Sequence, residues 1–102
     1  MKMIEDWQRR LGISDWKITT QRIDPENIDY NGEEYFIGIE RDFSTKTGII
    51  YHDIDLYEVA ICHELLHIKY PESMFPKLSF EEYEDWIDKK SEELVKNKYK
   101  YK

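Results

Sequence analysis

The sequence predicts one α+β domain, with a helix at the N-terminus, a small sheet in the middle and two helices in the C-terminal half. Three observations support this prediction. Apolar residues recur at helical spacing near both ends of the chain, and β-branched residues concentrate in segments between residues 16 and 52. A strongly apolar stretch after residue 55 carries the motif His63-Glu64-Leu65-Leu66-His67. With 102 residues, the whole chain, residues 1–102, is expected to be a single domain.

The first helix and the first strand are expected before residue 24. Residues 2–11 have the spacing of a short amphipathic helix, and Gly12 supplies a stop signal. Residues 16–23 are rich in β-branched side chains and predict a strand, which the pair Asp24-Pro25 ends. A turn or loop is expected around Asn31-Gly32.

Two further strands are predicted at residues 35–43 and 49–52. The connection between them, residues 44–48, has the length of a hairpin loop. Because hairpin strands are antiparallel, this pattern favours a small, mostly antiparallel sheet.

The two C-terminal helices each begin at a capping-box pattern. Asp55 with Glu58 predicts the start of the first, which is apolar on most sides and ends at Pro71. Ser79 with Glu82 predicts the start of the last helix, after a loop at residues 72–78, and this helix is expected to reach about residue 98. Its predicted buried face comprises Phe80, Tyr83, Ile87 and Leu94.

The composition excludes several classes of protein. A net charge of −7 argues against a nucleic-acid-binding surface, which needs clustered Lys and Arg. No stretch has the length of a membrane span or a signal peptide, and the single cysteine, Cys62, rules out an intrachain disulfide. A soluble, cytoplasmic protein without a membrane partner is therefore expected, and the abundance of Glu, Lys and Ile suggests a thermophilic source.

The motif His63-Glu64-Leu65-Leu66-His67 predicts a metal site. Two histidines four positions apart on a helix face the same way, so both can reach one ion. Glu64 and the two histidines interrupt an otherwise apolar helix, where an unpaired carboxylate is costly to bury. The ligand types favour Zn²⁺, with Glu64 as the general base of a peptidase.

A catalytic zinc site needs a third protein ligand. Cys62 points about 100° away from His63 around the helix and is expected to be a core residue. Carboxylates on the last helix are better candidates. Glu84 lies at the edge of the predicted buried face and is the preferred third ligand, with Glu81 as the alternative.

Other residues are expected to support the site. Asp88, one turn after Glu84, is predicted to hold the free ring nitrogen of a ligand histidine. His52, Tyr70 and Tyr83 are candidates by type for a hydrogen-bond donor to the transition state.

These residues resemble the gluzincins, the zinc peptidases whose third ligand is a glutamate. The last helix matches the spacing of the membrane-peptidase branch at residues 84–88, Ser91 and Leu94, although Ile87 stands where the longer relatives usually have Ala. The short chain without membrane spans resembles the soluble minigluzincins over roughly residues 35–98.

This resemblance implies a minimal zincin fold with a twisted sheet, the motif helix, and the last helix below a cleft. An edge strand, either residues 49–52 or the strand before it, would pair with an extended peptide or unfolded-protein substrate. The resemblance also implies a latent form, in which the tail at residues 95–102 is inhibitory, and a homodimer.

Two rival interpretations remain open. In the first, zinc stabilises a small non-catalytic interaction domain, for which a closed site with four protein ligands is expected. In the second, the chain is a regulatory peptidase that cuts one specific protein partner.

Overall fold

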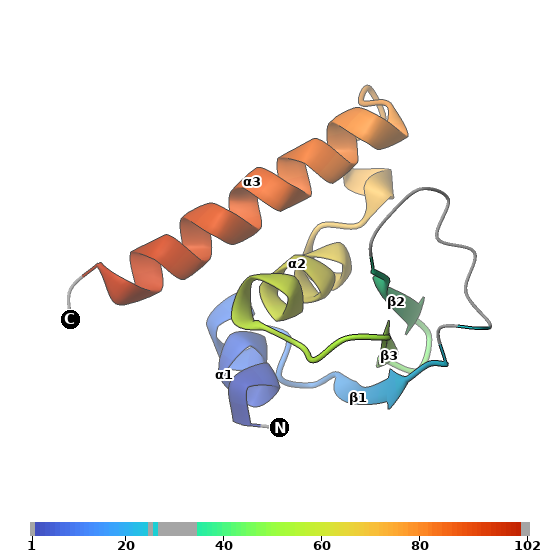
Figure 1. Cartoon of the computed structure of the whole chain (residues 1–102). Coiled ribbons are helices and arrows are strands. Elements are labelled where there is room, and N and C mark those ends of the chain that lie inside the picture. Colours follow the sequence, from blue (N-terminus) through green and yellow to red (C-terminus); the bar gives the residue numbers. More distant parts are fainter. Residues whose placement is uncertain (1, 25, 27–34, 101–102) are drawn as a thin grey trace.

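The computed structural model describes residues 2–24, 26 and 35–100 and has an α+β architecture (Figure 1). The predicted class and the predicted order of helices and strands are confirmed, and a short 3-10 helix lies in the expected loop before the last helix. The loop predicted around Asn31-Gly32 lies outside the described residues. In chain order the elements are α1 (Lys2–Leu11), β1 (Lys17–Arg22), β2 (Ile37–Asp42), β3 (Thr47–His52), α2 (Glu58–Lys69), η2 (Glu72–Met74) and α3 (Phe80–Tyr99).

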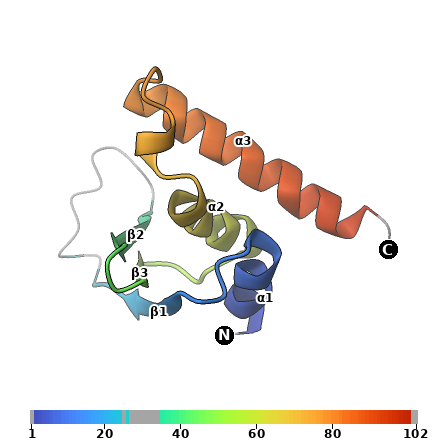
Figure 2. The same ribbon diagram turned by 180° about the vertical axis from the view of Figure 1, so that it is seen from behind.

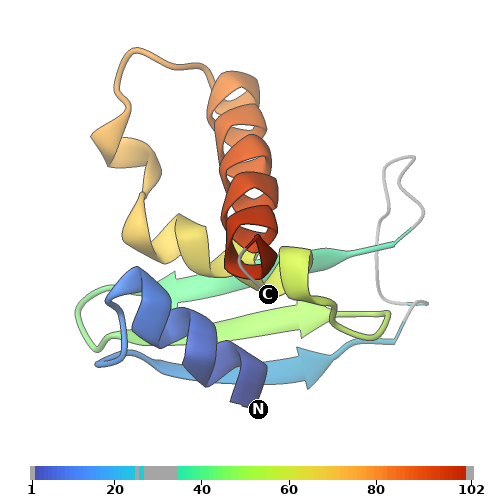
Figure 3. The ribbon, with the colours of Figure 1, turned by 90° about the vertical axis from the view of Figure 1, so that its left-hand side faces the viewer.

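The sheet is mixed, with β3 between β1 and β2 (Figure 3). β2 and β3 form the expected antiparallel hairpin, with Ile39 opposite Ile50, whereas β1 runs parallel to β3. The prediction of a mostly antiparallel sheet is therefore wrong, because a hairpin connection fixes only the β2–β3 pair and leaves the direction of β1 open. This order makes β1 and β2 the edge strands and places residues 49–52 in the centre of the sheet, so of the two predicted candidates for substrate pairing only β2 is an edge.

Helix α1 ends as its sequence predicts. Gly12 has a φ of 73°, a left-handed conformation that glycine adopts without steric cost. The N–H groups of Gly12 and Ile13 donate to the carbonyls of Arg9 and Gln8, at 3.2 and 2.8 Å. This is the Schellman arrangement, which satisfies carbonyls that the helix itself leaves free.

Helix α2 does not begin with the predicted capping box. Its N-cap is Tyr57, which makes no side-chain capping bond. The exposed side chain of Asp55 instead pairs with Arg22 of β1. Glu58 accepts hydrogen bonds from Trp7 of α1 (2.8 Å) and Lys98 of α3 (2.6 Å). The prediction is wrong because these contacts with neighbouring helices engage both carboxylates, so neither turns back to the backbone.

Helix α3 begins with the predicted capping box. Ser79 Oγ accepts from the Glu82 N–H at 3.1 Å, and the Glu82 carboxylate accepts from the Ser79 N–H at 3.0 Å. Tyr83 and Ile87 are buried and Leu94 is partly buried, as predicted. Phe80 is 69% exposed, so its assignment to the buried face is wrong. As the first residue of α3 it lies beyond the core and faces the cleft described below.

Helix α2 is the centre of the molecule. It lies between the sheet and α3, with α1 packed on another side, as opposite views show (Figures 1 and 2). Most of its side chains are buried, as its apolar sequence predicts, and Cys62 is fully buried in the core. Among the described residues no helix combines the length and the apolar character that a bilayer span requires. The buried hydrophobic core comprises Ile4, Trp7, Leu11, Ile13, Trp16, Ile50, Ile61, Cys62, Leu65, Leu66, Ile68, Tyr83 and Ile87.

Candidate metal centre

Three of the side chains predicted as ligands meet between α2 and α3. Glu84 Oε2 lies 3.5 Å from His63 Nε2, and Glu84 Oε1 lies 3.3 Å from His67 Nε2. One ligand atom from each of these residues lies within 4.8 Å of the others, so the His63–His67–Glu84 cluster could hold a metal ion. The helical spacing of the histidines and the capped start of α3 produce this convergence.

Two separations in this cluster are close to those between neighbouring ligands of a small tetrahedral ion. Zinc–nitrogen and zinc–oxygen bonds of about 2.0–2.1 Å place neighbouring ligand atoms roughly 3.4 Å apart at the corners of a tetrahedron. The two carboxylate–imidazole distances, 3.3 Å to Oε1 and 3.5 Å to Oε2 of Glu84, lie on either side of this value. The side chains present therefore suit a zinc-like ion in donor type, and they lie close enough together to hold one metal ion.

Glu81, the alternative third ligand, lies elsewhere. Its side chain is exposed and it is not part of the cluster; it lies in the first turn of α3, nearly one turn before Glu84. Asp85, which follows Glu84, is also exposed and pairs with Lys89 at 2.8 Å. Of the carboxylates in the first turns of α3, Glu84 is thus the one that the fold directs toward both histidines.

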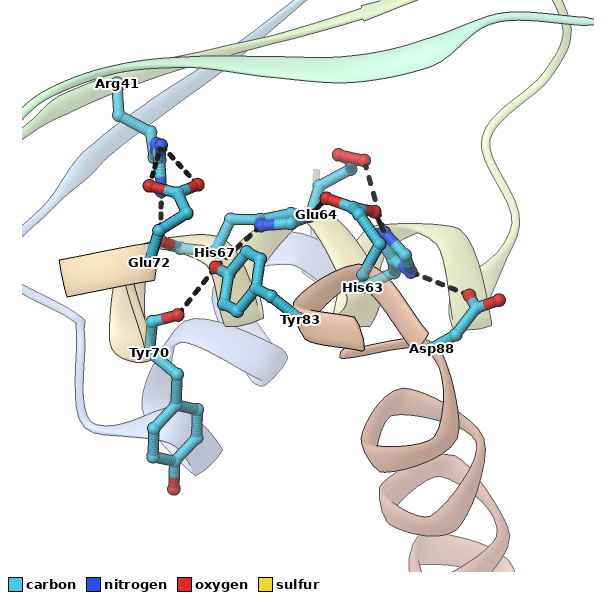
Figure 4. A network of polar contacts seen from close by, with 9 residues as sticks. Arg41, His63, Glu64, His67, Tyr70, Glu72, Tyr83 and Asp88 are labelled. Atoms are coloured by element: carbon cyan, nitrogen blue, oxygen red, sulfur yellow. Dashed lines mark hydrogen bonds and ion pairs between the residues drawn. The ribbon is translucent and has the colours of Figure 1, made fainter. Parts of the chain in front are cut away.

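The ring of His63 is held from behind by Asp88. His63 Nδ1 lies 2.9 Å from Asp88 Oδ1, the contact that the sequence predicts (Figure 4). Because a carboxylate oxygen accepts, Nδ1 carries the hydrogen and Nε2 is left facing Glu84.

The ring of His67 has a different partner. His67 Nδ1 lies 2.9 Å from the hydroxyl of Tyr83, and this hydroxyl donates to the carbonyl of Tyr70 at 2.7 Å (Figure 4). The sequence predicts Tyr83 as a core residue or a transition-state donor, but its pattern does not predict this contact. A buried tyrosine usually finds a hydrogen-bond partner, and that general rule is the signal available in the sequence.

The three predicted transition-state donors do not reach the ligand atoms of the cluster in the described residues. Tyr83 contacts Nδ1 of His67, the ring nitrogen that points away from the cluster. The ring of Tyr70 packs edge-on against Trp86, and Nδ1 of His52 contacts the carbonyl of Ile54 at 2.7 Å.

Glu64 borders the cluster and is almost completely buried, at 4% exposed. Its Oε1 lies 4.0 Å from His63 Nε2. Burial, together with the nearby charges of Glu84 and Asp88, raises the pKa of Glu64 to about 8, against a smaller opposite effect of Arg41. Burial also raises the pKa of Glu84, although His63 opposes that shift.

Burial shifts the pKa of His67 in the other direction. It lowers the pKa to about 4, helped by the neighbouring charges of His63 and Arg41. A neutral imidazole is the form that binds a metal. The site thus combines a neutral histidine with the carboxyl groups of Glu64 and Glu84. Ionisation of both carboxyl groups is unfavourable unless a cation lies between them.

A cleft of about 550 Å³ opens onto the cluster, and we call it the β2 cleft. Edge strand β2 forms one wall, α2 forms the floor, and η2 with the start of α3 forms the opposite wall. The lining residues are Phe36, Ile37, Gly38, Ile39, Arg41, His63, Glu64, His67, Glu72, Phe80 and Glu84.

Arg41 joins the two walls of the β2 cleft. Its guanidinium donates to the carbonyl of His67 and to both carboxylate oxygens of Glu72, at 3.1 and 3.2 Å (Figure 4). The last carbonyls of a helix lack intrahelical partners, so a cation is favourable there. Arg41 is not among the residues predicted from the sequence, although its position on the same strand face as Ile37 and Ile39 indicates a charge directed inward.

A smaller pocket of about 140 Å³ lies on the other side of His63 and Glu64. Tyr35 and Tyr57 line it, and their hydroxyl groups are 2.9 Å apart. That hydrogen bond and burial raise the pKa of Tyr57 to about 12.

The C-terminal segment lies at the far end of α3. Of the tail at residues 95–102, Lys98 and Tyr99 contact Glu58 at the start of α2, and residues 101–102 lie outside the described part of the chain. Among the described residues, none after position 88 lines the β2 cleft or the smaller pocket. An inhibitory role of the tail in a latent form or homodimer stays a prediction.

No protein-family model matches this chain, and no curated protein or solved structure is significantly similar to it. The resemblance to minigluzincins therefore remains a prediction from the motif residues.

Proposed function

We propose that this chain is a zinc-dependent metallopeptidase in which His63, His67 and Glu84 hold the ion and Glu64 is the general base. The observation that carries the proposal is the convergence of three suitably spaced ligand atoms on the floor of an open cleft, beside a buried carboxylate. Zinc, when bound, supplies a Lewis acid for the scissile carbonyl and lowers the pKa of the attacking water.

The position of Glu64 supports the proposed role in proton transfer. Its Oε1 is 4.0 Å from His63 Nε2, so the carboxylate borders the space that the ligand atoms enclose. In the proposed reaction Glu64 takes a proton from the attacking water and returns it to the leaving amine. Its burial keeps bulk water from competing for that proton.

The proposed substrate is an extended peptide or a segment of unfolded protein, which would lie along β2. The Asp53 N–H donates to the Phe36 carbonyl, so the backbone of Phe36 faces β3. In an antiparallel ladder the direction alternates, so the backbone groups of Ile37, Ile39 and Arg41 face the open edge. An added strand could pair with them, which is a common mode of peptide recognition.

The rival interpretation as a zinc-stabilised interaction domain is less well supported. A structural zinc site is usually closed by four protein ligands. Among the described residues the cluster has three, and Cys62 is buried in the core instead of joining them. An open position facing a cleft is the arrangement expected of a catalytic site. A regulatory peptidase specific for one partner would use the same chemistry on a narrower substrate.

Glu64→Gln is the decisive variant. It keeps the shape of the side chain and removes the base, so zinc should bind stoichiometrically while cleavage of an unfolded casein-like substrate is lost, by about 10²-fold or more. Glu81→Gln, an exposed change on α3, is the matched control and should retain activity. Full activity of the Glu64→Gln protein would exclude the assigned role, and a wild-type protein without bound metal would exclude the proposal. Cleavage of one partner alone would favour the regulatory peptidase.

A further inference from the structure

Tyr83 occupies an unusual place for a core aromatic residue. Its ring is 2% exposed and packs against the imidazole of His67, with ring centroids 5.4 Å apart. Its hydroxyl contacts His67 Nδ1 at 2.9 Å and the carbonyl of Tyr70 at 2.7 Å, and the side chain of Arg41 also hydrogen-bonds to it. These contacts connect α3 to the ring of a candidate ligand and to the residue that ends α2.

The two contacts determine which ring nitrogen carries the proton. A tyrosine hydroxyl has one hydrogen, and a backbone carbonyl can only accept, so Tyr83 donates its hydrogen to Tyr70. The oxygen of Tyr83 then accepts from His67, which requires the hydrogen of the imidazole to be on Nδ1. The lone pair is left on Nε2, the atom that lies 3.3 Å from Glu84 Oε1.

We propose that Tyr83 is a positioning residue that holds His67 in the Nδ1–H tautomer and so presents the Nε2 lone pair to the His63–His67–Glu84 cluster. The importance of this role rests on the proposed function, but the tautomer itself is a property of the metal-free protein. Tyr83 and Glu84 are consecutive on α3, so the side chains of two neighbouring residues contact the two nitrogens of the same imidazole.

The two ligand histidines differ in how replaceable their partners are. Asp88, which supports His63, has a side chain that is 65% exposed, so water can take its place if the carboxylate is removed. Tyr83 is buried, and removal of its hydroxyl leaves the Nδ1–H of His67 and the Tyr70 carbonyl without that partner. Loss of the Tyr83 hydroxyl should therefore change the tautomer of His67 more than loss of Asp88 changes that of His63.

The first measurement uses the wild-type protein without metal. Nitrogen-15 NMR of the histidine rings at pH 7 distinguishes a protonated Nδ1 from a protonated Nε2. The expected result is that His67 is protonated at Nδ1, and protonation at Nε2 would overturn the proposal. This result is independent of zinc binding and of peptidase activity, so failure of the proposed function would not be mistaken for failure of this inference.

The second measurement compares Tyr83→Phe with Tyr70→Phe. Tyr83→Phe keeps the buried ring and removes the hydroxyl, whereas Tyr70→Phe removes a hydroxyl but keeps the backbone carbonyl that Tyr83 contacts. Tyr83→Phe should give a mixture of His67 tautomers and weaken zinc binding by about 10- to 100-fold. Tyr70→Phe should change neither. A Tyr83→Phe protein with the wild-type tautomer, or with the wild-type dissociation constant, would overturn the proposal.

Discussion

Two glutamates of helix α2 have opposite electrostatic surroundings. Glu58 and Glu64 lie six positions apart on α2, and both side chains are largely buried. Burial alone would raise the pKa of Glu58, but hydrogen bonds from Lys98, Tyr99 and Trp7 outweigh it and lower the pKa. Burial raises the pKa of Glu64 to about 8, and the nearby Glu84 adds to the rise.

The difference separates a carboxylate whose charge is compensated within the chain from one whose ionised form is not. The charge of Glu58 is compensated by Lys98 of α3, so this junction is complete within the chain. Within the described residues, the one ion-pair partner recorded for Glu64 is His63, at 4.0 Å, and Glu84 and Asp88 add further negative charge. With a pKa of about 8, this carboxyl group is mostly protonated at neutral pH in the metal-free protein, whereas the proposed cation would favour its ionised form.

The largest expected effect is at the structural junction. Glu58→Ala removes the acceptor shared by Trp7 and Lys98, which tie α1 and α3 to α2. The free energy of unfolding should fall by about 2–3 kcal/mol, because hydrogen bonds to a buried charge are lost together. Chemical denaturation measures it, with the exposed Glu92→Ala on α3 as the control. An equal loss in both variants would show that Glu58 has no structural role.

The pH dependence of the free energy of unfolding of the metal-free protein, between pH 6.5 and 8, should come from Glu64 and not from Glu58. The folded-state pKa of Glu64, about 8, exceeds its unfolded value of 4.5, so the folded state binds the extra proton and stability falls as the pH rises between these values. His67, with a folded pKa of about 4 against 6.5, acts in the opposite direction, but only below pH 6.5. From pH 6.5 to 8 in EDTA, stability should therefore fall by roughly 1 kcal/mol per pH unit.

Variants of the two glutamates separate their contributions to this slope. Glu64→Gln should flatten the slope between pH 6.5 and 8, whereas Glu58→Gln should leave it unchanged, because the lowered pKa of Glu58 has its effect at acidic pH. Bound zinc should also remove the slope, since it compensates the charge. Thermal melts across this range, with EDTA or with zinc, test all three expectations. A slope that persists in the Glu64→Gln protein would contradict the assigned pKa.

Features set by local spacing are the ones that the sequence predicts well. The four-residue spacing of His63 and His67, and the burial pattern that selects Glu84 over Glu81, depend on helix geometry within a few residues. The same holds for Gly12 at the end of α1. These local patterns were sufficient to predict which three side chains meet.

Features that depend on contacts between distant segments could not be predicted in the same way. The parallel pairing of β1 with β3 joins two strands that are separated in the sequence by strand β2 and its connections. Arg41 reaches the carbonyl of His67 across 26 positions, and Tyr83 reaches the ring of His67 across 16. No periodicity along the chain encodes such contacts, although the inward position of each polar group gives a general signal that a partner exists.

The two capping-box patterns provide the smallest and most local test. Ser79→Ala should reduce the free energy of unfolding by about 1 kcal/mol, because the Glu82 N–H loses its acceptor at the start of α3. Asp55→Ala should cause no measurable change, since Asp55 is exposed and caps no helix. Denaturant titration of both variants gives the comparison. If Asp55→Ala were as destabilising as Ser79→Ala, Glu58 would be acting as a cap partner of Asp55. Glu58 would then not be a purely interhelical carboxylate, and its contrast with Glu64 would fail.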